Sequence, residues 1–338
     1  MESLATESDK PMGADHGPVV QSAILRTELV RLRKKNKLTQ EEVARVLEWS
    51  PSKLIRVEGG RSSITKVDLD ALLSRYVVTS DSDRERLHAL NRGAKEPGWW
   101  DGYRGEVAAP YLNYVGYEAG ASSIRQFPGT VVPGLLQTTQ YAEALTTSAV
   151  DAIEVAPVVK LRIQRQSELA QRREPPRQEY VLDEAVIRRH VGIESDPAIM
   201  PHELRFIADT AASSEFVTVR VIPFKAGAHP GLSGAFTLLE FEGDLPDLVY
   251  LDPGRADRAV IATDSTQVSE YASNFEALLS LALPERESIA FIRSAAEEML
   301  LNKGVLSRIK GFSALSERNS IISQGSGAFD HQIDDYLA

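Results

Sequence analysis

The side chains that could do acid–base or metal chemistry are few in this sequence, and their spacing suits neither. The six histidines never occur at the H-x-x-x-H or H-x-x-E spacing that places two metal ligands on one face of a helix. A zinc site would have to join His190, His202 and a carboxylate, and little favours it. Asp183 and Glu184 are adjacent carboxylates, but neighbours on a strand point to opposite faces of the sheet. We therefore expect no metal and no general acid–base pair.

Motifs of nucleophilic and phosphate chemistry are also missing. The chain has no cysteine, which excludes disulfides, thiolate zinc sites and cysteine nucleophiles. It has no G-x-S-x-G, no Gly-rich phosphate loop and no dinucleotide fingerprint. We predict no catalytic residue and no cofactor. An anion could meet a group of arginines in the second half of the chain, although Arg and Gln interleaved on a helix usually form a solvated face; the group is Arg162, Arg165, Arg172 and Arg173.

The elements that position the remaining functional residues differ sharply in charge. The 338 residues carry a net charge of -10, but residues 21–95 carry +6 and residues 96–338 carry -13. A uniformly acidic chain would argue against nucleic acid, because neutralising phosphates takes Lys and Arg; a basic module tied to an acidic body does not. No apolar run approaches the ~20 residues needed to cross a bilayer. We expect a soluble, cytoplasmic protein with no membrane partner.

Composition divides the chain into four parts. Residues 1–20 mix Ser, Gly, Pro and Asp and predict a disordered arm, and residues 303–338 predict a loosely ordered tail. Between them, residues 21–95 predict consecutive short helices, and residues 96–302 predict an α+β domain. The boundary falls in the linker 93–98, which contains glycine and proline.

The second domain contains segments with the hydrophobic period of a helix and segments with that of a strand. Residues 120–170 are predicted to be helical, as are residues 266–281 and 285–300. Strand-like runs lie between these helices, at residues 180–182, 216–222, 235–241 and 248–251. Helices flanking a small antiparallel sheet make an α+β architecture, in a chain that is mainly α overall.

Two short helices with strong start signals stand out in the basic segment. Thr39 is a predicted N-cap and Glu42 completes a capping box, for a helix that runs to about Val46. After a short turn, Ser50 is a second N-cap with Pro51 at the first helical position. Two helices of about eight residues joined by a tight turn predict a helix-turn-helix unit.

The second of these helices has one apolar face. Leu54 and Val57 are predicted to point inward, which leaves Ser52, Lys53, Ile55 and Arg56 outside. Further apolar stripes predict the helices that cover the pair, at Leu25, Leu29 and Leu32, at Leu69, Leu72, Leu73 and Tyr76, and at Leu87 and Leu90. Five helices in about 75 residues make a small all-helical core.

This stretch resembles the DNA-binding domain of Xre/Cro-type repressors. The pattern T-Q-E-x-x-A, then an N-capping Ser, then an apolar-x-x-apolar-E-x-G helix end matches Thr39 to Gly60. Glu48 departs from the pattern, because the family often has Gly in the turn, and a non-Gly residue costs ~1 kcal/mol there if φ is positive. The resemblance implies a five-helix, lambda-repressor-like bundle with the helix from Ser50 in the major groove.

The resemblance also implies which residues face double-stranded DNA. Lys53 and Arg56 would donate to guanine or phosphate, Ser52 to either, and Ile55 would meet a thymine methyl. Gln40 would contact phosphate or a base edge. The full set of implied DNA contacts is Lys37, Gln40, Ser50, Ser52, Lys53, Ile55, Arg56 and Arg61. We expect a homodimer on a pseudo-palindromic operator, because one recognition helix reads too few base pairs for genomic selectivity.

From Trp99 onward the chain resembles a narrower group, the actinobacterial regulators similar to WhiJ, whose C-terminal domain has no assigned activity. The matching pieces include Trp99-Trp100, 117–121, 132–138, Arg162 with Arg165-Gln166, 182–185, 188–189 and 219–223. The resemblance covers about residues 22–300, and it departs at 200–204 and in the tail. It implies a small partner protein encoded by a neighbouring gene, in an arrangement likened to toxin–antitoxin pairs.

The second domain opens with a dense group of aromatic side chains, which has two possible roles. Trp99, Trp100, Tyr103, Tyr111, Tyr114 and Tyr117 lie within about 20 residues. They could form an interdomain core, since large aromatics dominate buried area, or a ligand-stacking pocket. The residues predicted to bind a partner or ligand are Trp99, Trp100, Tyr103, Tyr117, Arg162 and Arg165.

These expectations describe a DNA-binding regulator, a repressor of its own gene, whose C-terminal domain binds a ligand or a small partner protein. The alternative is an enzyme or toxin–antitoxin component whose helix-turn-helix domain serves for autoregulation.

Overall fold

The computed structural model describes residues 17–148, 152–243, 245–251 and 260–301, and for residues 152–154 it describes the backbone alone. The predicted tail therefore lies outside the described residues, as does the predicted arm up to His16. The end of that arm was wrongly placed. Helix α1 begins at Pro18, and Val20 is completely buried, because this first turn packs against the second domain.

Five helices make up the basic segment, as predicted. They are α1 (Pro18–Lys35), α2 (Gln40–Val46), α3 (Pro51–Glu58), α4 (Lys66–Arg75) and α5 (Asp81–Gly93). The predicted apolar stripes form their core, with Leu29, Leu54 and Leu72 fully buried and Leu32 only partly so. The capping box of α2 is present: Thr39 accepts the backbone N–H of Glu42, and the Glu42 carboxylate accepts that of Thr39.

The second domain holds a six-stranded sheet in the order β3-β2-β1-β4-β5-β6. The strands are β1 (Ser123–Phe127), β2 (Arg177–Asp183), β3 (Val217–Ile222), β4 (Phe236–Glu240), β5 (Leu248–Leu251) and β6 (Val260–Ala262). The prediction of a small antiparallel sheet was only partly right, because the six-stranded sheet is mixed. The pairs β1–β2 and β2–β3 are parallel, whereas β1–β4, β4–β5 and β5–β6 are antiparallel.

The parallel half arises from two helical crossovers. Helices α7 (Thr139–Thr147) and α8 (Ala152–Ala170) connect β1 to β2, and α9 (Glu184–Arg188) and α10 (Ile199–Ser213) connect β2 to β3. Parallel strands need such long connections. The parallel pairing was not predicted, because β1 lies within residues 120–170, which were predicted to be helical. Strand β6 was not predicted either.

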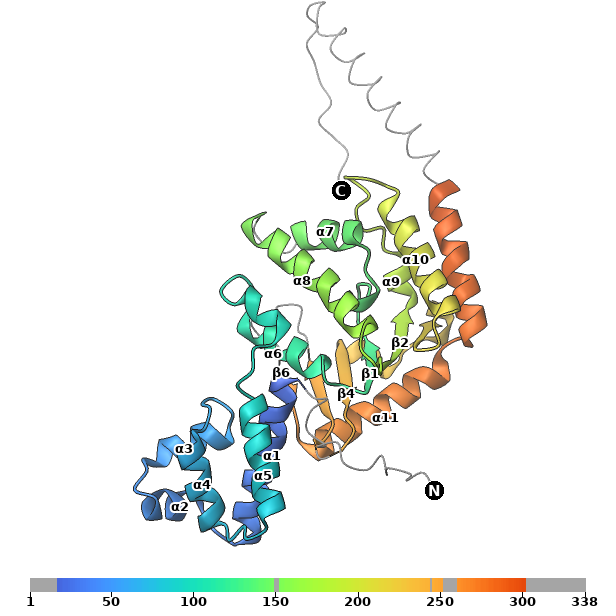
Figure 1. Cartoon of the computed structure of the whole chain (residues 1–338). Coiled ribbons are helices and arrows are strands. Elements are labelled where there is room, and N and C mark those ends of the chain that lie inside the picture. The colour runs from blue at the N-terminus through green and yellow to red at the C-terminus, as the bar shows by residue number, and fades with distance from the viewer. Residues whose placement is uncertain (1–16, 149–151, 244, 252–259, 302–338) are drawn as a thin grey trace, which may run out of the picture.

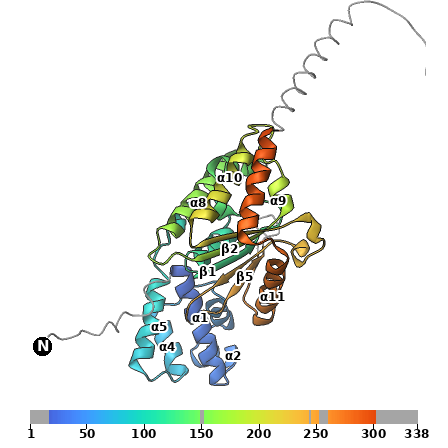
Figure 2. The ribbon, with the colours of Figure 1, turned by 90° about the vertical axis from the view of Figure 1, so that its right-hand side faces the viewer.

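Helices cover both faces of the sheet. Helix α11 (Ser265–Leu281) packs on one face, where Phe275 and Leu278 meet Val181 and Leu238. The opposite face carries α8, α10 and a last helix over 285–301, as Figures 1 and 2 show. The last two helices agree with the predicted ranges. No helix among the described residues is long and apolar enough to span a bilayer.

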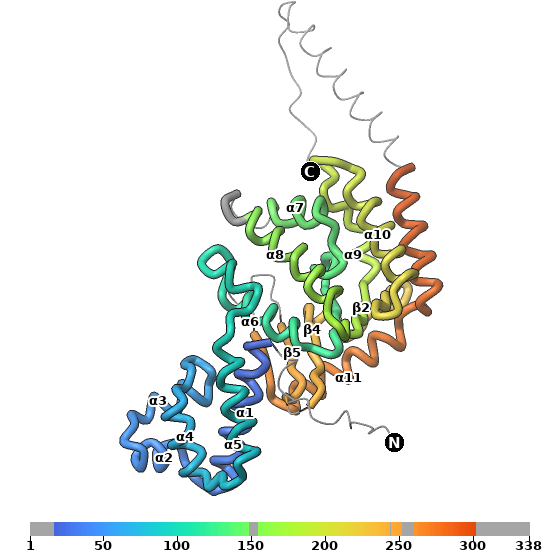
Figure 3. Tube along the Cα trace, in the orientation of Figure 1, coloured from blue at the N-terminus to red at the C-terminus, as the bar shows by residue number. Residues whose placement is uncertain are grey.

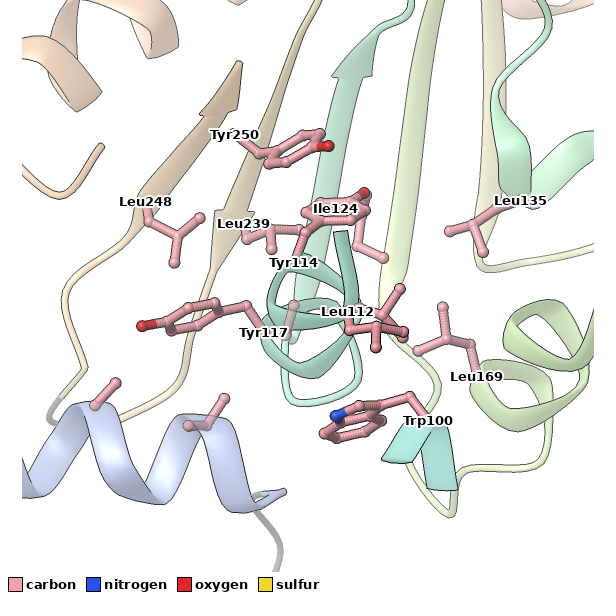
Figure 4. Close-up of a cluster of buried hydrophobic side chains, with 14 of the residues drawn as sticks. Trp100, Leu112, Tyr114, Tyr117, Ile124, Leu135, Leu169, Leu239, Leu248 and Tyr250 are labelled. Atoms are coloured by element: carbon pink, nitrogen blue, oxygen red, sulfur yellow. The ribbon is translucent and has the colours of Figure 1, made fainter. Parts of the chain in front are cut away.

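The two domains share one continuous hydrophobic core. The chain passes from α5 through a short turn and the 3-10 helix η1 (Trp99–Tyr103) into α6 (Ala109–Glu118), which Figure 3 traces. The first turns of α1 lie against α6, and a Cβ built at Gly116 would come within 2.4 Å of Val19 Cγ2. Trp100 and Tyr117 lie at this junction, whereas Tyr114 lies on the sheet side of α6 and stacks on Tyr250 at 4.0 Å between ring centroids (Figure 4). The interdomain role predicted for the aromatic group is thus present for Trp100 and Tyr117.

Candidate nucleic-acid interface

Helix α3 has the two-sided character predicted for it. Leu54 and Val57 are buried, whereas Ser52, Ile55 and Arg56 are exposed, Ile55 at 50%. Pro51 occupies the first turn and Ser50 the N-cap position, but the Ser50 side chain accepts no backbone N–H; its hydroxyl lies 3.2 Å from that of Ser52. The exposed Ile55 side chain is available for contact with an apolar group.

The turn before α3 contains one residue in the left-handed backbone conformation. Glu48 has φ = 55°, in the region that favours glycine. It follows the C-cap of α2, where the Trp49 N–H donates to the Ala44 carbonyl and the Glu48 N–H to that of Arg45. This Schellman arrangement ends α2 abruptly and sets the angle at which α3 leaves the turn.

A buried ion pair holds α3 against the first two helices. Arg33 donates twice to the Glu58 carboxylate, at 2.7 and 2.8 Å, and once to the Leu38 carbonyl at 2.9 Å. The side chains of Arg33 and Glu58 are 12% and 4% exposed. The hydrogen bond to Glu58 raises the pKa of Arg33, so the guanidinium stays charged. Gln40 joins it, with its amide donating to Glu58 at 2.6 Å.

Two predicted DNA contacts are therefore already engaged within the protein. Gln40 uses one of its amide N–H groups on Glu58, which leaves the other N–H and the carbonyl oxygen. Lys53 lies 2.8 Å from the Asp68 carboxylate and 4.0 Å from the centre of the Trp49 ring. Both side chains tie neighbouring helices together, so each combines a structural role with any contact to a ligand.

The other predicted cations are free. The side chains of Arg56 and Arg61 are exposed and make no hydrogen bond or ion pair within the described part of the chain. Lys37 is exposed in the turn after α1, with φ = 56°. In Figure 1, α2, α3 and α4 lie on the side of α1 and α5 that is turned away from the sheet domain. Helix α3 therefore lies on the side of the bundle away from the acidic body.

The structure separates the residues predicted to bind a ligand in the second domain. Trp99, Trp100 and Arg165 line a cavity of about 280 Å³ at the domain junction, which we call the junction cavity. Tyr103 is buried and donates to Gln164, and Tyr117 accepts a hydrogen bond from Arg26. Arg162 lies apart and donates to the Thr146 hydroxyl at 2.9 Å, between α7 and α8. The remaining walls of the junction cavity include Gly17, Pro97, Glu118, Glu168 and Arg172.

A second buried ion pair forms the floor of the junction cavity. Arg165 Nε lies 2.8 Å from Glu118 Oε2, and the two side chains are 5% and 1% exposed. Tyr114 donates to the other Glu118 oxygen at 2.6 Å, and Arg165 donates to Tyr111 at 2.5 Å. Burial raises the pKa of the Glu118 carboxyl, and the Arg165 guanidinium opposes that shift. Burial alone would lower the pKa of Arg165, but Glu118 and the tyrosines raise it.

The carboxylates considered for catalysis have structural partners. Asp183 accepts the N–H of Ala185 at the start of α9 and lies 3.0 Å from His229 Nε2, while Glu184 accepts the N–H of Phe224. His190 lies 3.0 Å from the Pro197 carbonyl. No group of three or more His, Asp or Glu side chains among the described residues could hold a metal ion.

Several functional residues were not predicted. Arg33 and Glu58 hold α3 in place, and Arg26 connects α3 to the second domain. Glu203 is buried in α10 and accepts the Thr138 N–H with one oxygen, while burial raises its pKa to about 8. A charged residue at an otherwise apolar helix position was the available signal for Arg33 and Glu203; nothing in the sequence pairs either with its partner.

Comparisons with known families agree with this division of the chain. Residues 24–87 match the model of a helix-turn-helix domain. Residues 111–294, more than half of the chain, match a domain of unknown function, DUF5753. No curated protein and no solved structure matches the chain. The helix-turn-helix match indicates DNA binding, and the family of the second domain carries no assigned activity. The chain belongs to the DUF5753 family, with a helix-turn-helix domain placed before the family's own domain.

Proposed function

We propose that this protein is a sequence-specific transcriptional regulator of the Xre/Cro type that reads DNA with α3. One observation carries the proposal: Ser52, Ile55 and Arg56 form an exposed face on a helix that Arg33 and Glu58 hold rigidly from beneath. A rigid support matters because base contacts need side chains placed within a fraction of an ångström. The regulator works in the cytoplasm, on chromosomal DNA.

The DNA contacts divide into two kinds. Arg56 reads a guanine or holds a phosphate, Ser52 does either, and Ile55 meets a thymine methyl. Ser50, Lys37 and Arg61 lie around this face and contact the backbone. Gln40 and Lys53 join after giving up part of their internal contacts. The protein binds as a homodimer to half-sites about one helical turn apart, and it represses its own gene.

The test is operator affinity in matched charge variants. Genomic fragments bound by the full chain are recovered first, and the tightest is used in gel shifts. Arg56→Ala is expected to weaken binding by about 1–3 kcal/mol, roughly 5- to 150-fold, because it removes a contact to base or phosphate. Arg92→Ala removes the same charge from α5, where Arg92 pairs with Glu85 at an exposed site. It is expected to leave affinity within about twofold. Equal affinity of wild type and Arg56→Ala would exclude α3 as the reading helix.

The C-terminal domain binds a small ligand or a small partner protein, as in the WhiJ-like regulators that the sequence resembles. The junction cavity supports a ligand, because two indoles and a charged pair meet in it. The net charge of -13 over residues 96–338 suits a basic partner. Titration of the full chain with the product of the neighbouring gene tests the partner form. A fluorescence change that Trp99→Leu abolishes would instead favour a ligand in the junction cavity.

The proposal assigns no catalytic step to either domain. The alternative is an enzyme or toxin–antitoxin component that uses its helix-turn-helix domain only for autoregulation. Turnover in a screen of nucleotides, together with no response to the neighbouring gene product, would favour that alternative.

A further inference from the structure

Arg26, on α1, touches both domains at once. Its Nη2 donates to the Tyr117 hydroxyl of α6 at 2.8 Å, and its Nη1 lies 3.5 Å from the carbonyl oxygen of Gly59, the C-cap of α3. One guanidinium therefore joins the recognition helix to the DUF5753 domain. We call the chain Gly59–Arg26–Tyr117 the interdomain link.

The α3 end of the interdomain link is closely packed. Gly60 has φ = 71°, and a Cβ built on it would lie 1.6 Å from Arg26 Nη1, so the guanidinium rests on the Gly60 backbone. The next residue is Arg61, whose N–H donates to the Arg56 carbonyl at 2.8 Å. The position of Arg26 thus restrains the last turn of α3 and the start of the loop that carries Arg61.

The other end of the interdomain link lies in the shared core. Tyr117 is 5% exposed, and its ring packs edge-on against Phe241 at 6.3 Å between centroids. The next residue along α6 is Glu118, which pairs with Arg165 in the floor of the junction cavity. Figure 4 shows Tyr117 reaching from α6 toward α1. A change in the packing of α6 would therefore move the hydroxyl that holds Arg26.

We propose that Tyr117 is a positioning residue for DNA binding, through which the DUF5753 domain sets the affinity of the recognition helix. The inference rests on the proposed function, since it assumes that α3 contacts DNA. A free arginine side chain samples many rotamers, and ordering it has an entropic cost. The hydroxyl of Tyr117 holds Arg26 in the rotamer that supports Gly59 and Gly60. Without that hydroxyl the guanidinium leaves, and the end of α3 frays.

The experiment compares two Tyr→Phe variants of the full chain. Tyr117→Phe keeps the ring and removes the hydroxyl. Tyr141→Phe is the matched control, because it removes a hydroxyl that accepts the Val132 N–H at 3.2 Å inside the second domain. The probe is the tightest duplex selected from random-sequence DNA. Tyr117→Phe is expected to weaken binding about three- to tenfold, within the range of the net contribution of one ordinary hydrogen bond. Tyr141→Phe should bind within twofold of wild type, and equal losses in the two variants would overturn the proposal.

Arg26→Gln tests whether Tyr117 acts through Arg26. If it does, adding Tyr117→Phe to Arg26→Gln weakens binding no further; additive losses would overturn the proposal. Amide hydrogen exchange over residues 57–61 gives a readout without DNA. Exchange there should be faster in Tyr117→Phe and unchanged in Tyr141→Phe, and an unchanged rate in Tyr117→Phe would overturn the inference. If the wild-type chain selects no duplex, the proposed function fails, while the exchange rates still decide whether Tyr117 restrains α3.

Discussion

The two domains place their energetic costs in different parts of the structure. In the helix-turn-helix domain the cost lies in the backbone: Lys37, Glu48 and Val77 all have positive φ, and each follows the C-cap of a helix. In the described part of the DUF5753 domain, every residue in that conformation is a glycine. There the cost lies in ionisable groups that are buried more deeply than the Arg33–Glu58 pair, namely Glu118 with Arg165, and Glu203.

The difference follows from what each domain must hold in place. Short helices joined by tight turns set the angle of α3. A residue in the left-handed region fixes the geometry of each turn, at a conformational cost of about 1 kcal/mol. The DUF5753 domain has a sheet and two helical layers to fix its shape. It can enclose ionised groups, which cost more and which respond to pH and to bound ligands.

The largest expected effect tests the buried charge. Arg165→Met should lower the free energy of unfolding by about 3–5 kcal/mol, because it leaves Glu118 buried without its partner. Arg33→Met, at the corresponding pair of the helix-turn-helix domain, should cost less, since Arg33 is 12% exposed and water can reach Glu58 after the change. Urea unfolding of the full chain measures both.

The control for this prediction removes both charges. Arg165→Met combined with Glu118→Gln should recover most of the lost stability, since neither side chain then carries the desolvation penalty of a buried charge. Equal losses in Arg165→Met and Arg33→Met would mean that the two domains do not differ in how they hold charge.

The second effect is a pH dependence that only the DUF5753 domain should show. Glu203 has a folded-state pKa of about 8, above its ordinary value of 4.5, because burial disfavours the carboxylate. The folded chain then holds a proton that the unfolded chain releases. The stabilisation is present in full below about pH 4.5 and is lost as pH rises through 8. Between pH 6 and pH 8 the loss should be about 2 kcal/mol.

The measurement is urea unfolding of wild type and Glu203→Gln at several pH values. Glu203→Gln keeps an oxygen for the Thr138 N–H and should abolish the loss of stability between pH 6 and pH 8. The exposed control Glu215→Gln should retain that loss. A wild-type slope that survives in Glu203→Gln would assign the pH dependence to other groups.

The sequence predicted the helix-turn-helix domain far better than the second domain, for a physical reason. Its signals are local: the capping box at Thr39, the proline at the start of α3 and the helical period of Leu54 and Val57 lie within a few residues of one another. The family pattern also singled out Glu48 as a turn position where Gly is frequent, and Glu48 has φ = 55°.

The sheet topology could not be predicted in the same way. The five residues of β1 lie in a stretch that reads as helical, and their partners in β2 and β4 are about 50 and 110 residues away. The functional contacts share this difficulty. Arg33 with Glu58, Arg26 with Tyr117 and Lys53 with Asp68 join residues whose pairing no local period reveals. The exposed face of α3 was predictable, and its support was not.

A third prediction concerns the backbone cost. Val77 is 67% exposed and has φ = 57°, which is unfavourable for a β-branched residue. Val77→Gly should stabilise the chain by about 1 kcal/mol, because it relieves the strain and gives up little buried surface. Val77→Ala keeps the Cβ and should gain less than half of that. Thermal unfolding of the two variants decides; destabilisation by Val77→Gly would show that this turn carries no strain.

The smallest effect tests how the helix-turn-helix domain divides its charges between structure and DNA. Asp68 holds Lys53 by an ion pair at 2.8 Å, and Lys53 also lies over Trp49. Asp68→Asn should free the ammonium for a phosphate and remove a negative charge beside the proposed interface. Operator binding should tighten about two- to fivefold, while stability falls by less than about 1 kcal/mol, because the pair is partly exposed.

The matched control for Asp68→Asn is Asp83→Asn, which removes the same charge from the first turn of α5, at an exposed position. Both variants change the net charge equally, so any difference reports the position of the charge and not its sum. Equal tightening would mean that long-range attraction alone sets the affinity. Weaker binding in Asp68→Asn would mean that the ion pair of Lys53 with Asp68 orients α3. Lys53 would then have a structural role and would not make the DNA contact predicted for it.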